Sequence, residues 1–186
     1  MKKILSIPLI GLLCFTACKK SDSSSNKTSS TFTATVNGKA TTFNIISATL
    51  LRSQGANEKR MDIAGTSTDN SKRLIITLGI ETYLGTGMTV KSYVLNPFPV
   101  DDPSTPNIDE SLTTQGFTTY STSLGNGSWF TDVYNEQGSF TVTGCDSAHT
   151  MVSGTFQTTL KDLNTDTTVV SINDGKLSNV KYTVVN

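Results

Sequence analysis

The sequence predicts an all-β domain: an antiparallel β-sandwich of about ten short strands, with a closed or partly open β-barrel as the alternative. From residue 31 onward, apolar side chains alternate with polar ones at a period of two, which is typical of strands and not of helices. The chain holds 31 Thr and 22 Ser, a content that favours strands with one solvated face. Turn signals recur at the short, regular spacing of a sandwich or barrel.

The first half of the domain begins with a predicted hairpin. Residues 31–36 alternate, Asn37-Gly38 is the signal for a type I′ turn, and residues 39–44 return. Four further strands are expected, at residues 46–50, 60–66, 73–80 and 88–95. Residues 74–76 are apolar on both faces, so the strand that holds them should lie in the middle of the sheet.

The second half predicts four more strands, which pair as two hairpins: residues 138–144 with 151–160, and residues 167–172 with 177–185. The first pair would turn at residues 145–150 and the second at Asn173-Asp174-Gly175. Residues 96–111 break this rhythm, because four of the five prolines fall there and proline cannot donate to a central strand. One short helix is expected at residues 107–114.

Asn126-Gly127 is the strongest hairpin signal in the chain, because a type I′ turn needs two positive φ angles. With this pair at the centre of the turn, the predicted cross-strand pairs are Leu124 with Trp129 and Ser123 with Phe130. Alternation then puts Leu124 and Trp129 on the core side and the other pair on the solvent side.

The same register predicts an aromatic strip on the outer face. Tyr120 shares the buried face with Trp129, whereas Phe130 and Tyr134 face solvent, with Phe117 beyond them. Two aromatic rings on one strand surface form a flat strip on which a sugar ring could rest, so Phe117, Phe130 and Tyr134 are the candidate ligand-binding residues. The alternative is that a neighbouring strand or loop covers the strip, or that it is exposed without a ligand.

The first seventeen residues have the three-part layout of a secretory signal. Lys2 and Lys3 precede an apolar run of about a dozen residues, which is too short to span a bilayer. Small residues and then Cys18 follow, and residues 19–30 are polar enough to act as a flexible tether. The expected organisation is a signal peptide at 1–17, a tether at 18–30 and one domain at 31–186.

The segment Phe15-Thr16-Ala17-Cys18 resembles a bacterial lipobox, with Phe15 where the usual pattern has Leu. The resemblance implies that Cys18 is acylated and that the protein is lipid-anchored in the outer membrane of the cell envelope. The alternative is an ordinary secreted protein that is cleaved nearby. Because Cys14 lies in the leader, Cys145 would be left alone and no disulfide framework is expected.

Three segments of the domain are similar to a family of Bacteroidetes-type lipoproteins known only as a domain of unknown function. They read TFTATVNGKATTF, GSFTVTGCDSAHTMVSGTF and VSINDGKLSNVKY. The family usually has Phe where this chain has Leu177. The resemblance implies the fold and the compartment, and it implies no activity.

Composition and spacing give little support to catalysis or to metal binding. The formal net charge is zero, which does not suit a nucleic-acid binder. His149 follows Cys145 by four residues, which is better explained by a polar turn than by a thiol nucleophile with its base. One His and one Cys are too few for zinc. Residues 162–173 lack the Gly and Glu of an EF-hand loop.

The leading hypothesis is a non-enzymatic, lipid-anchored envelope module that binds a glycan or an envelope protein and needs no cofactor. One rival is an envelope hydrolase whose carboxylates, such as Asp101, Asp102 and Asp132, are assembled on loops. A solvated loop is the simpler interpretation of the acidic pairs Asp101-Asp102 and Asp109-Glu110. A third hypothesis is a purely structural envelope protein.

Overall fold

The computed structural model describes residues 29–95, 116–131, 133–162 and 164–186. Within these ranges the chain forms eleven strands and no helix. The strands are β1 Thr31–Val36, β2 Lys39–Ser53, β3 Glu58–Ser67, β4 Lys72–Thr82, β5 Ser92–Leu95, β6 Gly116–Ser123, β7 Trp129–Phe130, β8 Val133–Asp146, β9 Met151–Asp162, β10 Thr168–Lys181 and β11 Thr183–Val185. No described segment forms a helix of the length and apolarity that crossing a membrane requires.

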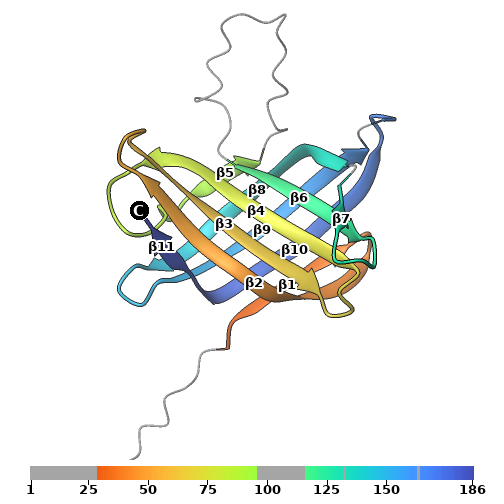
Figure 1. Cartoon of the computed structure of the whole chain (residues 1–186), viewed down its shortest axis with the longest axis horizontal. Coiled ribbons are helices and arrows are strands. Elements are labelled where there is room, and N and C mark those ends of the chain that lie inside the picture. Colours follow the sequence, from red (N-terminus) through yellow and green to blue (C-terminus); the bar gives the residue numbers. More distant parts are fainter. Residues whose placement is uncertain (1–28, 96–115, 132, 163) are drawn as a thin grey trace, which may run out of the picture.

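Ten strands follow one path of hydrogen-bonded neighbours, in the order β5-β8-β9-β10-β1-β2-β3-β4-β6-β7. All neighbours along this path are antiparallel, and β11 adds a short parallel pairing to β2. The sheet curls into a half-barrel (Figure 1). The predicted all-β class is therefore confirmed, with an architecture consistent with a β-sandwich or a partly open barrel.

The long strand β2 carries the chain from one layer of the half-barrel to the other. Its first residues pair with β1, and its later residues pair with β3. The register shifts between Ile45 and Ser47, which is where a bulge bends a strand. At the seam, Asn135 of β8 donates to the Leu95 carbonyl oxygen of β5 at 2.9 Å. Gly116 of β6 leaves room for Leu95, since an added Cβ would lie 3.0 Å from the Leu95 side chain.

The core between the layers is built around four phenylalanines, Phe32, Phe43, Phe140 and Phe156, all of them buried. The rings of Phe140 and Phe156 stack with centroids 6.0 Å apart. A Cβ at Gly175 would lie 2.5 Å from the Phe156 ring, so this position takes glycine because the ring occupies the space of a side chain. The sheet curves over these rings because its glycines let the backbone approach them closely.

Two local predictions in the first half of the domain are confirmed. Asn37 has φ of 47° and Gly38 of 79°, as the type I′ turn between β1 and β2 requires. The strand that contains residues 74–76 lies between β3 and β6, inside the sheet as expected. Leu74 and Ile76 are both fully buried.

Three predicted boundaries are wrong. The strands expected at 39–44 and 46–50 are one continuous strand, β2, with a register shift between Ile45 and Ser47. Asn173-Asp174-Gly175 is not a turn, because β10 continues through it with a register shift between Ile172 and Gly175. Asp174 takes a positive φ of 50°. That backbone suits a bulge as well as a turn, and the pairing of β10 with β1 and β9 on its two sides keeps the strand extended. The strand expected at 88–95 begins only at Ser92, because the preceding residues cross one end of the half-barrel.

The predicted register of the hairpin at residues 126–127 is also wrong. Thr122 pairs with Phe130 and Ser123 with Trp129, one residue away from the expected pairs. The positive φ angles fall on Gly125 and Gly127, so the loop is longer than a two-residue turn. The ladder is short because the chain leaves β6 after Phe130 and β8 then pairs with β9. A short ladder supplies little burial to fix the register.

Candidate functional site

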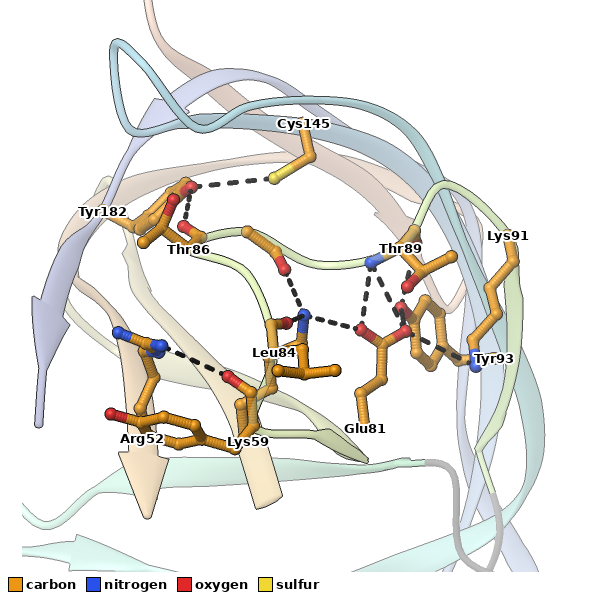
Figure 2. Close-up of polar contacts among 12 residues, drawn as sticks. Arg52, Lys59, Glu81, Leu84, Thr86, Thr89, Lys91, Tyr93, Cys145 and Tyr182 are labelled. Carbon is orange, nitrogen blue, oxygen red and sulfur yellow. Dashed lines mark hydrogen bonds and ion pairs between the residues drawn. The ribbon is translucent and has the colours of Figure 1, made fainter. Parts of the chain in front are cut away.

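The two ends of the half-barrel differ, and the first is closed by residues 83–91, which connect β4 to β5 (Figures 1 and 2). We call it the plugged end. Lys59 of β3 is buried there, and its ammonium donates to the carbonyl oxygens of Leu84 at 2.8 Å and Gly87 at 2.6 Å. The same ammonium lies 3.3 Å from Oε2 of Glu81 on β4. One buried cation therefore holds the connecting segment and a carboxylate together.

Glu81 is the acceptor at the centre of this cluster. The Tyr93 hydroxyl and the Thr89 backbone N–H donate to its carboxylate, and Lys91 Nζ lies 3.4 Å from it. Burial raises the pKa of Glu81, but the hydrogen bonds from Tyr93, Thr89 and Lys59 outweigh it and hold the pKa below its ordinary value. Burial and the neighbouring Glu81 raise the pKa of Tyr93, so its phenol stays protonated.

Cys145 and Tyr182 complete the plugged end (Figure 2). The Tyr182 hydroxyl donates to the Thr86 carbonyl oxygen at 2.8 Å and lies 3.7 Å from Cys145 Sγ. Gly87 passes directly beside the thiol, where a Cβ would lie 2.7 Å from the sulfur. Lys59, Glu81, Tyr93 and Tyr182 thus find their polar partners within the plugged end, which is the arrangement of a structural closure, whereas Arg52 Nε is buried there without a partner among the described residues.

His149 does not meet the Cys145 thiol. Its Nδ1 lies 2.6 Å from Oδ2 of Asp146 on an exposed turn, and this contact holds the pKa of Asp146 below its ordinary value. The polar turn expected at 145–150 is therefore present. A similar turn follows β9, where Asp162 Oδ1 accepts the N–H groups of Asn164 and Thr165. In the described part of the chain, no group of three His, Cys, Asp or Glu side chains could hold a metal.

The opposite end, which we call the mouth, holds a pocket of about 530 Å³. Its rim consists of the β1–β2 turn and the β3–β4 turn, and Tyr120 of β6 lies in its wall. The ends are opposite because β3 runs from Lys59 to Ser67, a span of about 26 Å at the usual rise per residue. The pocket is lined by Val36, Asn37, Lys39, Ala40, Thr41, Thr42, Ser67, Thr68, Asp69, Ser71, Lys72 and Tyr120.

Tyr120 is the distinctive residue of the mouth. Its side chain is buried, as the sequence predicts, with 9% of the residue exposed. Within the described ranges no group forms a hydrogen bond with its hydroxyl. Burial, together with the charge of Asp69, raises the pKa of Tyr120. The mouth therefore contains a protonated phenol with an unused donor.

Two charged side chains of the mouth are held in place by the β3–β4 turn and by β6. Lys72 Nζ donates to Thr122 Oγ1 at 2.9 Å and lies 5.9 Å from the centroid of the Tyr120 ring. Asp69 Oδ1 accepts hydrogen bonds from the Ser67 hydroxyl at 2.5 Å and from the Ser71 N–H at 3.0 Å. The Ser67 and Ser71 hydrogen bonds lower the pKa of Asp69 to about 2.

The predicted aromatic strip is divided between two faces of the sheet. Trp129, predicted to be buried, is half-buried on the outer face, with the Arg73 guanidinium 5.9 Å from its ring centroid. Phe130 is exposed as predicted, but its pairing with Thr122 puts it on the Tyr120 face. Phe117 is half-buried on the opposite face. Leu124, expected in the core, is exposed. The side chain of Tyr134 lies outside the described part of the structure.

The carboxylates of the hydrolase hypothesis cannot be placed in the site. Asp101, Asp102, Asp109, Glu110 and Asp132 lie outside the described residues, as do the proline-rich segment at 96–111 and the helix expected at 107–114. The mouth was not predicted from the sequence, because its lining comes from two turns and a strand that are distant in sequence. The available signal was Tyr120, a polar-tipped residue on the buried face of its strand.

Comparison of the chain with protein-family models, with curated proteins and with solved structures finds no match.

Proposed function

We propose that the protein is a lipid-anchored, non-enzymatic binding module of the cell envelope that holds a small polar ligand in the mouth. The observation that carries the proposal is the Tyr120 hydroxyl, which has no partner among the described residues although its side chain lies in the wall of a pocket of about 530 Å³. A donor that no described group of the chain uses, on the wall of a concave site, is available to a ligand, since ligand sites combine apolar walls with a few placed polar groups. The volume lies in the range of about 300–1,000 Å³ typical of small-ligand sites.

The chemistry of the mouth favours binding over hydrolysis. Asp69 is the one carboxylate among the described lining residues, and a carboxyl group with a pKa of about 2 remains ionised near neutral pH. A general acid or base works best with a pKa near the working pH. Asp69 therefore suits the positioning of a ligand better than proton transfer.

The place where β1 begins supports the same proposal. Thr31 at the start of β1 pairs with Ser178, and the Ser30 hydroxyl donates to the Asn179 carbonyl oxygen at 2.7 Å. Both partners lie towards the C-terminal end of β10, which leads to Tyr182 at the plugged end. A lipid on Cys18 would therefore join the domain on the side of the plugged end and leave the mouth free of the point of attachment. Membership in the lipoprotein family that the three segments resemble is part of this proposal.

The anchor is tested by replacing its acylated residue. Cys18→Ser should move the protein from the membrane fraction to the soluble fraction, because the signal and the tether remain but the lipid is lost. Fractionation followed by immunoblotting measures the change. A variant that stays with the membrane would contradict lipid anchoring at Cys18.

The mouth is tested with the full chain carrying Cys18→Ser and a panel of monosaccharides and disaccharides, followed by two-dimensional NMR. We expect chemical-shift changes confined to the pocket lining. Ala40→Trp should abolish them by filling the pocket, whereas the matched control Thr155→Trp places the same ring at an exposed position of β9, outside the mouth. A panel that produces no shifts at the mouth, or shifts that survive Ala40→Trp, would overturn the proposal.

A further inference from the structure

The mouth has a surplus of one positive charge. Lys39, Lys72 and Asp69 are the charged side chains among its described lining residues. Neither lysine forms an ion pair within the described chain, whereas Lys59, Lys91 and Lys161 are all paired with carboxylates. A ligand with one negative charge would balance this surplus.

The charge of Asp69 is stabilised within its own turn. Three donors converge on Oδ1: the Ser67 hydroxyl, the Ser71 N–H and the Ser71 hydroxyl. These bonds stabilise the ionised form and hold the loop without an ion pair to either lysine. The negative charge of Asp69 still counts, so the net charge of the mouth stays at one positive charge. The two ammonium groups remain available to a ligand.

Lys72 and Tyr120 are arranged to act on one acceptor. The bond to Thr122 directs the Lys72 ammonium to the same side of the sheet as the Tyr120 ring, and it uses one of three N–H donors. The Tyr120 hydroxyl contributes a further donor that stays protonated because its pKa is raised. An ammonium and a phenol are strong donors to an oxyanion, since hydrogen bonds with an ionised partner are stronger than neutral ones.

The rest of the lining suits a hydroxylated body. The hydroxyl groups of Thr41, Thr42, Thr68 and Ser71 line the pocket, and Val36 and Ala40 add small apolar surfaces. Such a wall offers hydrogen bonds to ring hydroxyls and contact to C–H groups. A doubly charged phosphate would exceed the charge that the mouth can balance, whereas a single carboxylate matches it.

We propose that the ligand of the mouth is an acidic sugar with one carboxylate, which Lys72 and the Tyr120 hydroxyl bind. The inference rests on the proposed function and specifies its ligand class. It is separate from the aromatic strip expected from the sequence, because the binding groups are a lysine and a tyrosine inside the mouth.

The test compares sodium glucuronate with glucose, which has a CH₂OH group in place of the carboxylate, and with glucose 6-phosphate. The full chain with Cys18→Ser is titrated by calorimetry and by NMR. Glucuronate should bind at least about tenfold more tightly than glucose, as expected for hydrogen bonds to a charged group. Lys72→Gln and Tyr120→Phe should each weaken glucuronate binding about tenfold, and Lys72→Gln should weaken glucose binding by a smaller factor, because glucose has no carboxylate for the ammonium to bind.

Lys176→Gln is the matched control, because Lys176 is an exposed lysine on β10 outside the mouth. Equal binding of glucose and glucuronate at the mouth would overturn the acidic-sugar inference and leave the proposed function standing. Tighter binding of glucose 6-phosphate would overturn the choice of a single charge. Failure of all three sugars, while other members of the saccharide panel shift the mouth, would overturn the inference alone. Failure of the whole panel would overturn both.

Discussion

The plugged end and the mouth use the same three kinds of side chain, a lysine, a carboxylate and a tyrosine, with opposite results. At the plugged end, Lys59, Glu81 and Tyr93 bond to one another and to the connecting segment. At the mouth, the Tyr120 hydroxyl has no partner in the described chain. The comparison teaches that residue type does not distinguish a structural cluster from a binding site. The distinction lies in whether the chain itself supplies every partner.

The lengths of the connections account for the difference. Residues 83–91 are long enough to cross the end of the half-barrel, and they bring the carbonyl groups of Leu84, Thr86 and Gly87 to the cluster. The two turns at the mouth, Asn37-Gly38 and residues 68–71, are too short to cross it. One long connection therefore closes the plugged end, whereas two tight turns leave the mouth open.

The largest expected effect is the loss of the buried cation. Lys59→Met should lower the free energy of unfolding by about 3–5 kcal/mol, because it leaves the Glu81 carboxylate and two carbonyl groups without their buried partner. The mouth counterpart Lys72→Met should change it by less than about 0.5 kcal/mol. Urea denaturation measures both, and equal losses would remove the contrast between the ends. Adding Glu81→Leu to Lys59→Met should recover part of the loss, because it removes the unpaired carboxylate but leaves the Leu84 and Gly87 carbonyl groups without their donor.

A smaller effect follows from removing one hydroxyl at each end. Tyr93→Phe should cost about 1–3 kcal/mol of unfolding free energy, because it deletes the donor to buried Glu81. Tyr120→Phe should cost close to zero, since the hydroxyl it removes bonds to no described group. The two proteins differ only in the position of an identical change. A cost for Tyr120→Phe as large as that for Tyr93→Phe would show that Tyr120 has a partner within the chain.

The smallest expected effect is on the free energy of unfolding in acid. The folded pKa of Glu81 is lowered from 4.5, so its contribution is present above pH 4.5 and is lost as the pH falls through the folded value. Asp69, lowered from 3.8 to about 2, contributes above pH 3.8 and loses its contribution towards pH 2.

Urea midpoints measured from pH 7 to pH 2 separate the two ends. The Lys59→Met/Glu81→Leu variant should lack the part of the decline that begins near pH 4.5. Asp69→Asn should lack only the part between pH 3.8 and about 2. Unchanged pH profiles in both variants would exclude these carboxylates as the source of acid sensitivity.

Local signals in the sequence predicted some elements well. Asn37-Gly38 fixes its turn because both positive φ angles and the flanking alternation agree. Asn126-Gly127 predicted the wrong register. Gly125, Asn126 and Gly127 in a row allow several loop conformations, and the strand after the loop makes only a short ladder with β6. Asp174-Gly175 indicated a turn where neighbours on both sides impose a continuous strand. Sequence alone carries no information about those neighbours.

The plugged end could be predicted only in part. Lys59 lies on the same face as Met61 and Ile63, which is a signal of burial for a charged residue. Glu81 gave no such signal, because the register shift between β3 and β4 changes which residues of β4 face the core. Glu81 lies 22 residues after Lys59 in the sequence, and the two meet through the pairing of β3 with β4. Local alternation does not specify this pairing.

The place of β1 in the sheet would have a mechanical consequence for the proposed lipid-anchored protein. A pull at Thr31 acts on a strand that is bonded along both sides, to β10 and to β2. Because the pull runs along the strand, it shears two ladders of hydrogen bonds together instead of peeling one ladder bond by bond. In the lipid-anchored protein that we propose, drag on the domain would thus be met at the point of attachment by an interior strand, where an edge strand would yield at lower force.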